Sequence, residues 1–198
     1  MHTYWYLGRS AGFVSYWLLW SIVLLGLAVR SRLFDGWINR GWVFEFHRFL
    51  SLLVLLVVTF HALIMLPDPY ARFSLREVLV PFQSHLHNTP MALGIVALYG
   101  AIFLTASFYV RFLIGQRVWR LLHYLTFAVY VLALLHGLLN GTDSTGALVL
   151  GSYYLSAVAV LFFLFYRLLA TRRPTTGTKD FAAGRRRLSP ATSTWEHE

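Results

Sequence analysis

Long runs of apolar residues constrain the fold of this chain more than any other feature of its sequence. Five runs come close to the ~20 helical residues needed to cross a hydrocarbon layer about 30 Å thick. They cover approximately residues 12–29, 46–66, 91–114, 118–139 and 147–169. Apolar residues are continuous within each run, whereas the strands of a membrane barrel would alternate apolar and polar residues. We therefore expect an all-α integral membrane protein, a bundle of five transmembrane helices.

Composition agrees with a single membrane domain. Hydrophobic residues make up 58% of the 198 residues and charged residues only 13%, against about 25% charged in a soluble domain. We assign residues 1–170 to one transmembrane domain and expect the polar, basic segment 171–198 to be a disordered cytoplasmic tail. The sequence contains no cysteine, which excludes disulfides, thiolate-held iron–sulfur clusters, covalently attached c-type haem and cysteine zinc sites.

The distribution of basic residues predicts the orientation of the bundle. With five spans, the loops after the first and third spans lie on the same side as the C-terminus. That side carries 14 of the 17 Lys and Arg residues, and the other carries Arg9, Arg72 and Arg76. The positive-inside rule therefore predicts an outside N-terminus and a cytoplasmic C-terminus. We expect membrane lipid and no nucleic acid as the partner of this basic chain, and a prokaryotic cytoplasmic membrane as its location.

Four of the eight histidines lie within the predicted spans and form a regular pattern. His47 and His61 are spaced H-x13-H in the second span, and His123 and His136 are spaced H-x12-H in the fourth. These two helices run in the same direction, so His47 and His123 are expected at similar depth near the inner face. His61 and His136 are expected together near the outer face. At about 1.5 Å per residue, the two levels lie roughly 20 Å apart.

Paired imidazoles inside a membrane favour a metal cofactor. A neutral imidazole offers one lone pair to iron, and two imidazoles can occupy both axial positions of a haem. Two b-type haems at two depths would form a path for electrons, whereas isolated histidines in hydrocarbon are costly. Interhelical hydrogen bonding by ordinary core histidines is the alternative. On an ideal helix, His47 and His61 share a face to within about 40°, but His123 and His136 point about 140° apart. The fourth helix should therefore twist, carry a bulge, or present its ligands from different sides.

Basic and polar residues near the histidines are further candidates. Arg48 and Arg120 could hold the anionic propionates of an inner haem; otherwise they are orientation signals. Asn140 could approach the outer level. Glycines within the spans could let helices or a porphyrin approach closely, although ordinary helix packing explains them equally well; they are Gly12, Gly26, Gly94, Gly100 and Gly137.

The long loop between the second and third spans carries its own signals. Leu75, Val78 and Leu79 predict one or two interfacial helical turns. His85 and His87 form an H-x-H pair that could bind a metal, relay protons or contact an oxidant, while solvated loop histidines are the ordinary interpretation.

The double histidine spacing resembles that of the ferric reductase-like transmembrane domain family. Its members include the membrane parts of ferric reductases and NADPH oxidases, and the haem subunit of bacterial methionine-sulfoxide reductase. The segment "VPF" before the third span and "WRLLH" at the start of the fourth add to the resemblance. The family implies that His47 and His123 ligate one haem b and that His61 and His136 ligate the other. It also implies electron flow outward from the cytoplasmic side.

The function expected from this resemblance is transmembrane electron transfer by the membrane subunit of an oxidoreductase. The sequence has no G-x-G-x-x-G fingerprint and no P-loop, so we expect a flavoprotein or quinol donor and an extracytoplasmic redox partner as acceptor. Whether this chain itself is an enzyme stays open. A histidine-lined proton or metal transporter is one alternative, which the lack of acidic residues inside the spans disfavours. A structural haem subunit of a larger complex is another.

Overall fold

The computed structural model describes residues 3–30, 39–69, 72–141 and 146–170. Every regular element within them is helical, and the fold class is therefore confirmed as all-α. The helices are α1 (Thr3–Arg30), α2 (Arg40–Ile64), α3 (Leu75–Leu79), α4 (Asn88–Tyr109), α5 (Arg111–Ile114), α6 (Gln116–His123), α7 (Leu125–Asn140) and α8 (Ala147–Ala170). The predicted tail, 171–198, and most of the first loop, 31–38, lie outside the described residues.

Five helical segments are long and apolar enough to cross a membrane: α1, α2, α4, the continuous stretch of α6 and α7, and α8. The predicted number of spans is confirmed, but three boundaries differ by five residues or more. The first helix begins at Thr3, well before residue 12, because its polar first turns continue the same helix. The second helix begins at Arg40, six residues before its predicted start. The third span ends at Tyr109 and is followed by the short α5, because Val110 leaves helical geometry and Gly115 turns the chain at a φ of 81°.

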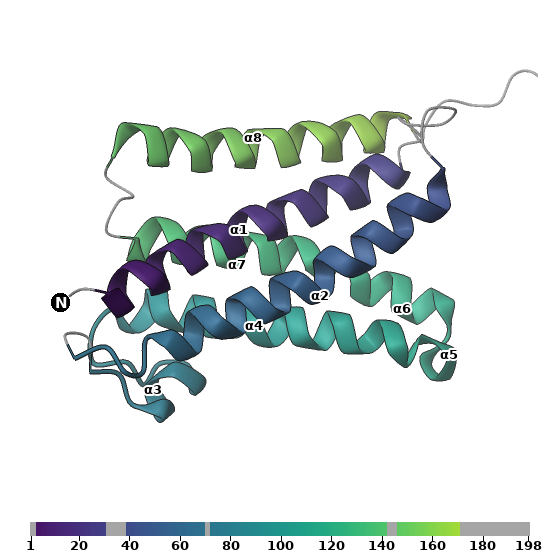
Figure 1. Cartoon of the computed structure of the whole chain (residues 1–198). Helices are drawn as coiled ribbons and strands as arrows, with labels where there is room; N and C mark the ends of the chain where they lie inside the picture. The colour runs from purple at the N-terminus through teal and green to yellow at the C-terminus, as the bar shows by residue number, and fades with distance from the viewer. Residues whose placement is uncertain (1–2, 31–38, 70–71, 142–145, 171–198) are drawn as a thin grey trace, which may run out of the picture.

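The spans pack as two close antiparallel pairs with one additional helix. α1 lies along α2, α4 lies along α7, and α8 covers the outer side of α1 and α7 (Figure 1). The end of the bundle that carries α3 and the start of α1 is called the α3 side below, and the end that carries α5 is called the α5 side. Since the number of spans is odd, α1 begins on the α3 side and α8 ends on the α5 side; which side is cytoplasmic stays a prediction.

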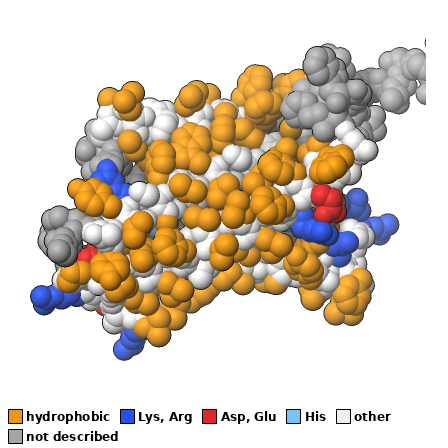
Figure 2. All heavy atoms as spheres, in the orientation of Figure 1, with side chains coloured by type: hydrophobic (Ala, Val, Ile, Leu, Met, Phe, Trp, Pro, Cys, Tyr) orange, Lys and Arg blue, Asp and Glu red, His pale blue; other side chains and the backbone are white. Residues whose placement is uncertain are grey.

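The surface of the bundle is that of a lipid-facing protein. Hydrophobic side chains cover the middle of the visible face, while charged side chains gather at its two ends (Figure 2). Large apolar residues such as Leu148 and Phe112 are 90% and 77% exposed. Contiguous exposed apolar area of this extent is unfavourable in water, whereas in a bilayer it needs no burial.

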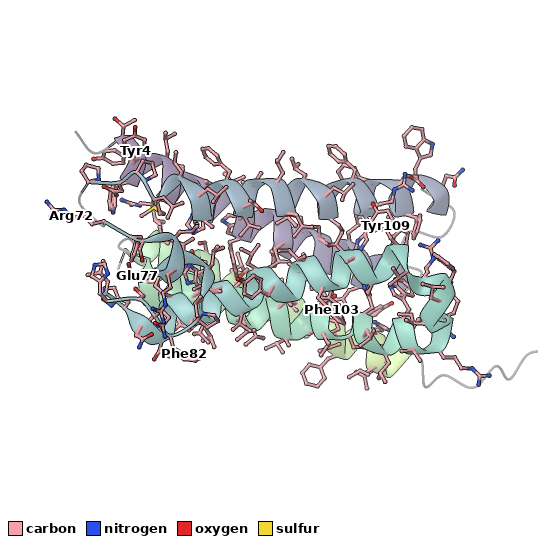
Figure 3. All side chains as sticks on the ribbon, turned by 90° about the horizontal axis from the view of Figure 1, so that it is seen from below. Tyr4, Arg72, Glu77, Phe82, Phe103 and Tyr109 are labelled. Carbon is pink, nitrogen blue, oxygen red and sulfur yellow. The ribbon has the colours of Figure 1, made fainter. Side chains whose placement is uncertain are left out.

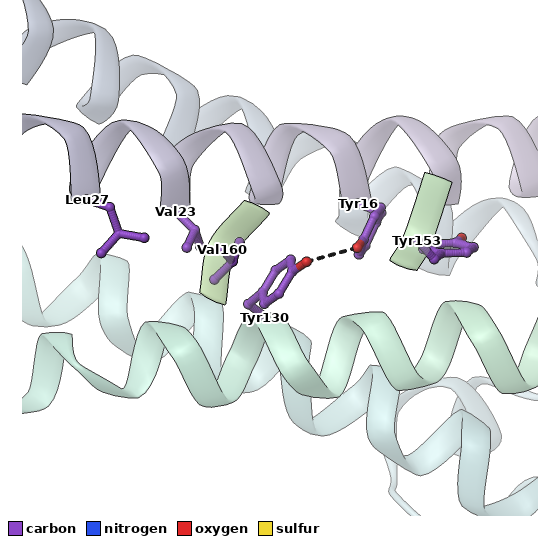
Figure 4. Packing of buried hydrophobic residues seen from close by; sticks show 6 residues of the cluster. All are labelled: Tyr16, Val23, Leu27, Tyr130, Tyr153 and Val160. Carbon is purple, nitrogen blue, oxygen red and sulfur yellow. Dashed lines mark hydrogen bonds between the residues drawn. The ribbon is translucent and has the colours of Figure 1, made fainter. Parts of the chain in front are cut away.

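A core between α1, α7 and α8 holds the last helix in place. Tyr16, Tyr130 and Tyr153 form its centre, and the Tyr16 and Tyr130 hydroxyls lie 3.2 Å apart (Figure 4). Both hydroxyls also hydrogen-bond to Ser156, which is completely buried. The hydroxyls of Tyr16, Tyr130 and Ser156 thus find partners inside the protein, as hydrocarbon surroundings require.

The short helix predicted at Leu75, Val78 and Leu79 is confirmed as α3, and Glu77 within it lies at the α3 side of the bundle (Figure 3). Ser74 caps its N-terminus, and the Glu77 carboxylate accepts in return from the Ser74 backbone N–H at 2.9 Å. Glu77 also accepts a backbone hydrogen bond from His85 at 3.0 Å and bonds to the His85 ring. The hydrogen bonds from His85, followed by those from Ser74, hold the pKa of the Glu77 carboxyl at about 2. We call residues 73–85 the cap.

Candidate functional site

The four span histidines meet in two pairs. His47 on α2 faces His123 at the end of α6, with ring centroids 6.2 Å apart. His61 on α2 faces His136 on α7, with ring centroids 6.3 Å apart. These are the pairs expected from depth along the helices, although their role as ligands stays a prediction. His61–His136 is the α3-side pair and His47–His123 is the α5-side pair.

The geometry of both pairs suits one metal ion between two imidazoles. A metal–imidazole bond is about 2 Å long and the nitrogen lies about 1 Å from the ring centre, so two axial imidazoles place their centroids about 6 Å apart. Both pairs have this spacing. A direct hydrogen bond between two rings would require closer nitrogens, and none joins the rings of either pair. Among the described residues, no group of three or more His, Cys, Asp or Glu side chains is placed to hold a metal ion, so each pair would depend on a ligand set completed by the cofactor.

Backbone carbonyls orient the α3-side pair. His61 Nδ1 lies 2.6 Å from the Gly8 carbonyl oxygen, and His136 Nδ1 lies 2.8 Å from the Pro90 carbonyl oxygen. A carbonyl only accepts, so each Nδ1 carries the proton and donates it. This tautomer leaves the Nε2 lone pair for a metal, which is the usual arrangement around metal-binding histidines.

The α5-side pair is supported differently. His47 Nδ1 is buried and has no hydrogen-bond partner among the described residues, and the same is true of Trp119 Nε1. The Trp119 ring packs on His123, with centroids 5.2 Å apart and planes tilted by 31°. This contact was not predicted from the sequence. Trp119 lies near the end of a predicted span, where a tryptophan is ordinarily a residue of the membrane interface.

Glycines on neighbouring helices make room for three of the four imidazoles. A Cβ on Gly12 would lie 2.8 Å from the His61 ring, and one on Gly94 would lie 2.6 Å from the His136 ring. Such distances are too short for any side chain. Gly26 faces His47 at a less restrictive 3.5 Å. The close approach of a ring to a glycine, one interpretation of these residues, therefore applies to Gly12 and Gly94.

The helix break after His123 reduces the expected 140° offset. α6 ends at His123, and Tyr124 separates it from α7. Tyr124 N–H donates to the Leu121 carbonyl at 3.1 Å, and Phe127 N–H donates to the Tyr124 carbonyl at 3.2 Å. These three-residue hydrogen bonds are of the 3₁₀ type, in which each residue advances about 120° instead of about 100°. Several tightened residues thus turn both histidines toward α2, the first of the three solutions considered.

A cavity surrounds each pair. The α5-side cavity has a volume of about 240 Å³ and is lined by His47 and His123 together with apolar residues of α1, α2, α4 and α7. The α3-side cavity has a volume of about 700 Å³ and extends from His61 and His136 along α1 toward the cap and α8. Apolar walls with a few convergent polar groups are typical of cofactor sites.

The two arginines predicted to bind propionates lie differently. Arg48 lines the α5-side cavity and forms an exposed ion pair with Glu45 at 2.8 Å. Arg120 is exposed, donates to the Gln116 carbonyl at 3.2 Å and is not among the described residues that line either cavity. Asn140 lines the α3-side cavity. His85 belongs to the cap, where it binds Glu77.

The comparison with protein families decides the classification. The model of the ferric reductase like transmembrane component matches residues 11–134. The chain belongs to this family. The match contains His47, His61 and His123 and ends two residues before His136, so α8 lies outside it. Neither the curated proteins nor the solved structures gave a match. Ferric reductase-like transmembrane domains generally bind haem, and membership indicates electron transfer across a membrane.

Proposed function

We propose that this ferric reductase-like chain carries electrons across the membrane through two b-type haems, as the membrane subunit of an oxidoreductase. The α5-side pair would hold one haem and the α3-side pair the other. The observation that carries the proposal is the spacing of the two imidazole pairs, 6.2 and 6.3 Å between ring centroids. Haem iron, when bound, supplies a one-electron redox couple.

The chain's own residues would hold and insulate these groups. His61 and His136 are already fixed by carbonyls in the tautomer that can bind a metal. Apolar side chains form most of the walls of both cavities. Arg48 and Arg120 are the cations proposed to neutralise propionates on the α5 side, because charge-assisted hydrogen bonds are stronger than neutral ones. If two imidazoles hold each cofactor, a substrate could not bind the iron, so we assign electron transfer to this chain and leave catalysis to its partners.

Direction and partners extend the proposal. The excess of basic residues supports a cytoplasmic location of the α5 side, so electrons would enter near His47 and His123 and leave near the cap. A flavoprotein or a quinol is the proposed donor, and an extracytoplasmic redox protein is the proposed acceptor. The location of such a system would be a prokaryotic cytoplasmic membrane.

A proton or metal transporter is less well supported. Intramembrane relays use chains of acidic and histidine side chains. Among the described residues, no Asp or Glu lines either cavity, and the four histidines face each other in pairs. A structural haem subunit would have the same site and differ only in its partners, so co-purification of a reducible partner protein separates the two.

Haem content of purified variants tests the proposal directly. The wild-type protein in detergent should show a dithionite-reducible b-type spectrum with two haems per chain. His47→Ala and His61→Ala should each lose one haem, while His85→Ala, a control in the cap, should keep both. Unchanged haem content in both span variants would exclude these ligands.

A further inference from the structure

Four aliphatic side chains separate the two cavities. Leu19, Val54, Ala101 and Val129 line both the α3-side and the α5-side cavity, and each comes from a different helix: α1, α2, α4 and α7. We call this layer the septum. None of its side chains carries a polar atom.

The septum lies midway between the two histidine levels. Val54 is seven residues from His47 and seven from His61 along α2. Leu19 is seven residues from both Gly12 and Gly26 on the antiparallel α1. The two helices therefore present the same elements twice, a histidine against a glycine, with Leu19 and Val54 between the copies.

The septum is closely packed. Val54 and Val129 are only 7% and 5% exposed. Leu19 packs against the buried cluster that contains Val54 and also against the one that contains Val129. Gly100 makes this packing possible, because a Cβ there would lie 2.7 Å from Val129 Cγ2.

Polar groups line each cavity on its own side of the septum. Arg48 lines the α5-side cavity, and Arg9 and Asn140 line the α3-side cavity. The two cavities together thus extend along most of the bundle, and the septum is the layer that keeps them apart. If the septum opened to water, a file of water molecules could join the two sides of the membrane.

We propose that the septum blocks water and protons between the two cofactor sites, so that the chain conducts electrons and not protons. The electron part of this statement rests on the proposed function. Electrons can tunnel through a few ångströms of close-packed aliphatic groups, whereas proton transfer needs a chain of hydrogen-bonding groups. An apolar constriction stays dry even where it has space for water, and four aliphatic side chains form such a constriction.

Proton flux into liposomes tests the septum. Purified full-length holoprotein is reconstituted with a pH-sensitive dye inside, and a potassium diffusion potential drives protons inward. Wild type should match protein-free liposomes. Val54→Ser/Val129→Ser, which adds both space and hydroxyls, should raise proton flux by about an order of magnitude. Val54→Ala/Val129→Ala should stay close to wild type, because an enlarged apolar gap remains dry.

Two further variants keep the test decisive. Val23→Ser/Val160→Ser places the same hydroxyls in the buried core of α1 and α8, away from both cavities, and should not leak. Val54→Thr/Val129→Thr preserves side-chain shape, so it serves if the serine variant fails to fold, and it should leak less than serine but more than wild type. A septum variant with hydroxyls that folds and seals like wild type would overturn the proposal, as would equal leakage from the core variant.

Haem content measured on the same samples distinguishes this proposal from the proposed function. Wild type that leaks protons while holding two haems overturns the septum and supports electron transfer. Wild type that seals but binds no haem supports the septum and overturns electron transfer.

Discussion

The two histidine pairs have the same spacing but very different surroundings. On the α3 side, both Nδ1 atoms bond to backbone carbonyls, and glycines lie directly against both rings. On the α5 side, His47 Nδ1 has no described partner, and His123 packs on Trp119. The cavities differ as well, at about 700 and about 240 Å³.

The difference shows that two ligand pairs on shared helices can be prepared for a cofactor to different extents. The α3-side imidazoles are held by backbone atoms that no side-chain substitution removes. A hydrogen bond at Nδ1 also raises the basicity of the ligating nitrogen. We expect the α3-side haem to bind more tightly, and the predictions below test this contrast.

Substitution of the glycines should separate the two sites most strongly. In Gly94→Ala, the new methyl would overlap the His136 ring, whose Nδ1 lies 2.6 Å from that position, so the α3-side haem should be lost. In Gly26→Ala, the methyl would meet His47 at 3.5 Å, an ordinary contact. The pyridine haemochrome assay should give about one haem per chain for the first variant and two for the second. Equal haem content in the two variants would contradict the proposed difference between the two sites.

Loss of Trp119 should weaken only the α5-side site. Trp119→Ala removes the ring that orients His123, and loss of such supporting contacts typically lowers affinity at least about ten-fold. Trp119→Phe should retain most of the binding, because a ring remains against the imidazole. Haem titration of the apoprotein measures both. Trp42→Ala, at a side chain that is 76% exposed, is the control and should bind like wild type.

The arginines should have smaller effects within the α5-side site. Arg48→Gln removes a cation from the cavity wall and should weaken haem binding there by about two- to five-fold, the range of a partly exposed charge pair. Arg120→Gln should have less effect, because Arg120 points away from the cavity lining toward the Gln116 carbonyl. Titration at low and high salt checks the assignment, since screening should reduce the Arg48 effect. A larger effect from Arg120 would reverse the proposed roles.

A substitution in the cap should have the smallest effect of the four, and this effect should be confined to the α3 side. The Glu77 pKa of about 2 lies below its ordinary value of 4.5. The carboxylate therefore stabilises the cap fully above about pH 4.5, and this contribution is lost as the pH falls toward 2. Glu77→Gln should raise amide hydrogen exchange in residues 74–85 at neutral pH and leave the α5-side spectrum unchanged. Wild type should approach the exchange of the variant only in acid.

Local sequence patterns predicted much of this architecture. Apolar runs identified five spans because lipid requires their length, and the common direction of α2 and α7 paired the histidines correctly in space. The interfacial helix was predicted at Leu75–Leu79 and lies there. The family match over residues 11–134 confirms the resemblance carried by the histidine spacing.

Features that depend on contacts between helices were not predictable in the same way. The tightened turn at Tyr124 compensates for one missing residue between His123 and His136, but its sequence has no proline or glycine to announce it. The close contact between Gly12 and the His61 ring could not be predicted, because it depends on the register in which α1 packs on α2. The bond between Glu77 and His85 joins α3 to the irregular segment that follows it, and no local pattern of residues indicates such a contact.

The seven-residue repeat of α1 and α2 also limits how many redox centres this architecture can stack. The two span histidines of α2, the proposed ligands, are separated by 14 residues, which is about 21 Å of helix. A third level at the same interval would require about 42 Å between the outermost ligands, more than the ~30 Å thickness of the hydrocarbon. At this interval, two redox centres fit within the thickness of the bilayer. A longer electron-transfer path would have to continue in another protein.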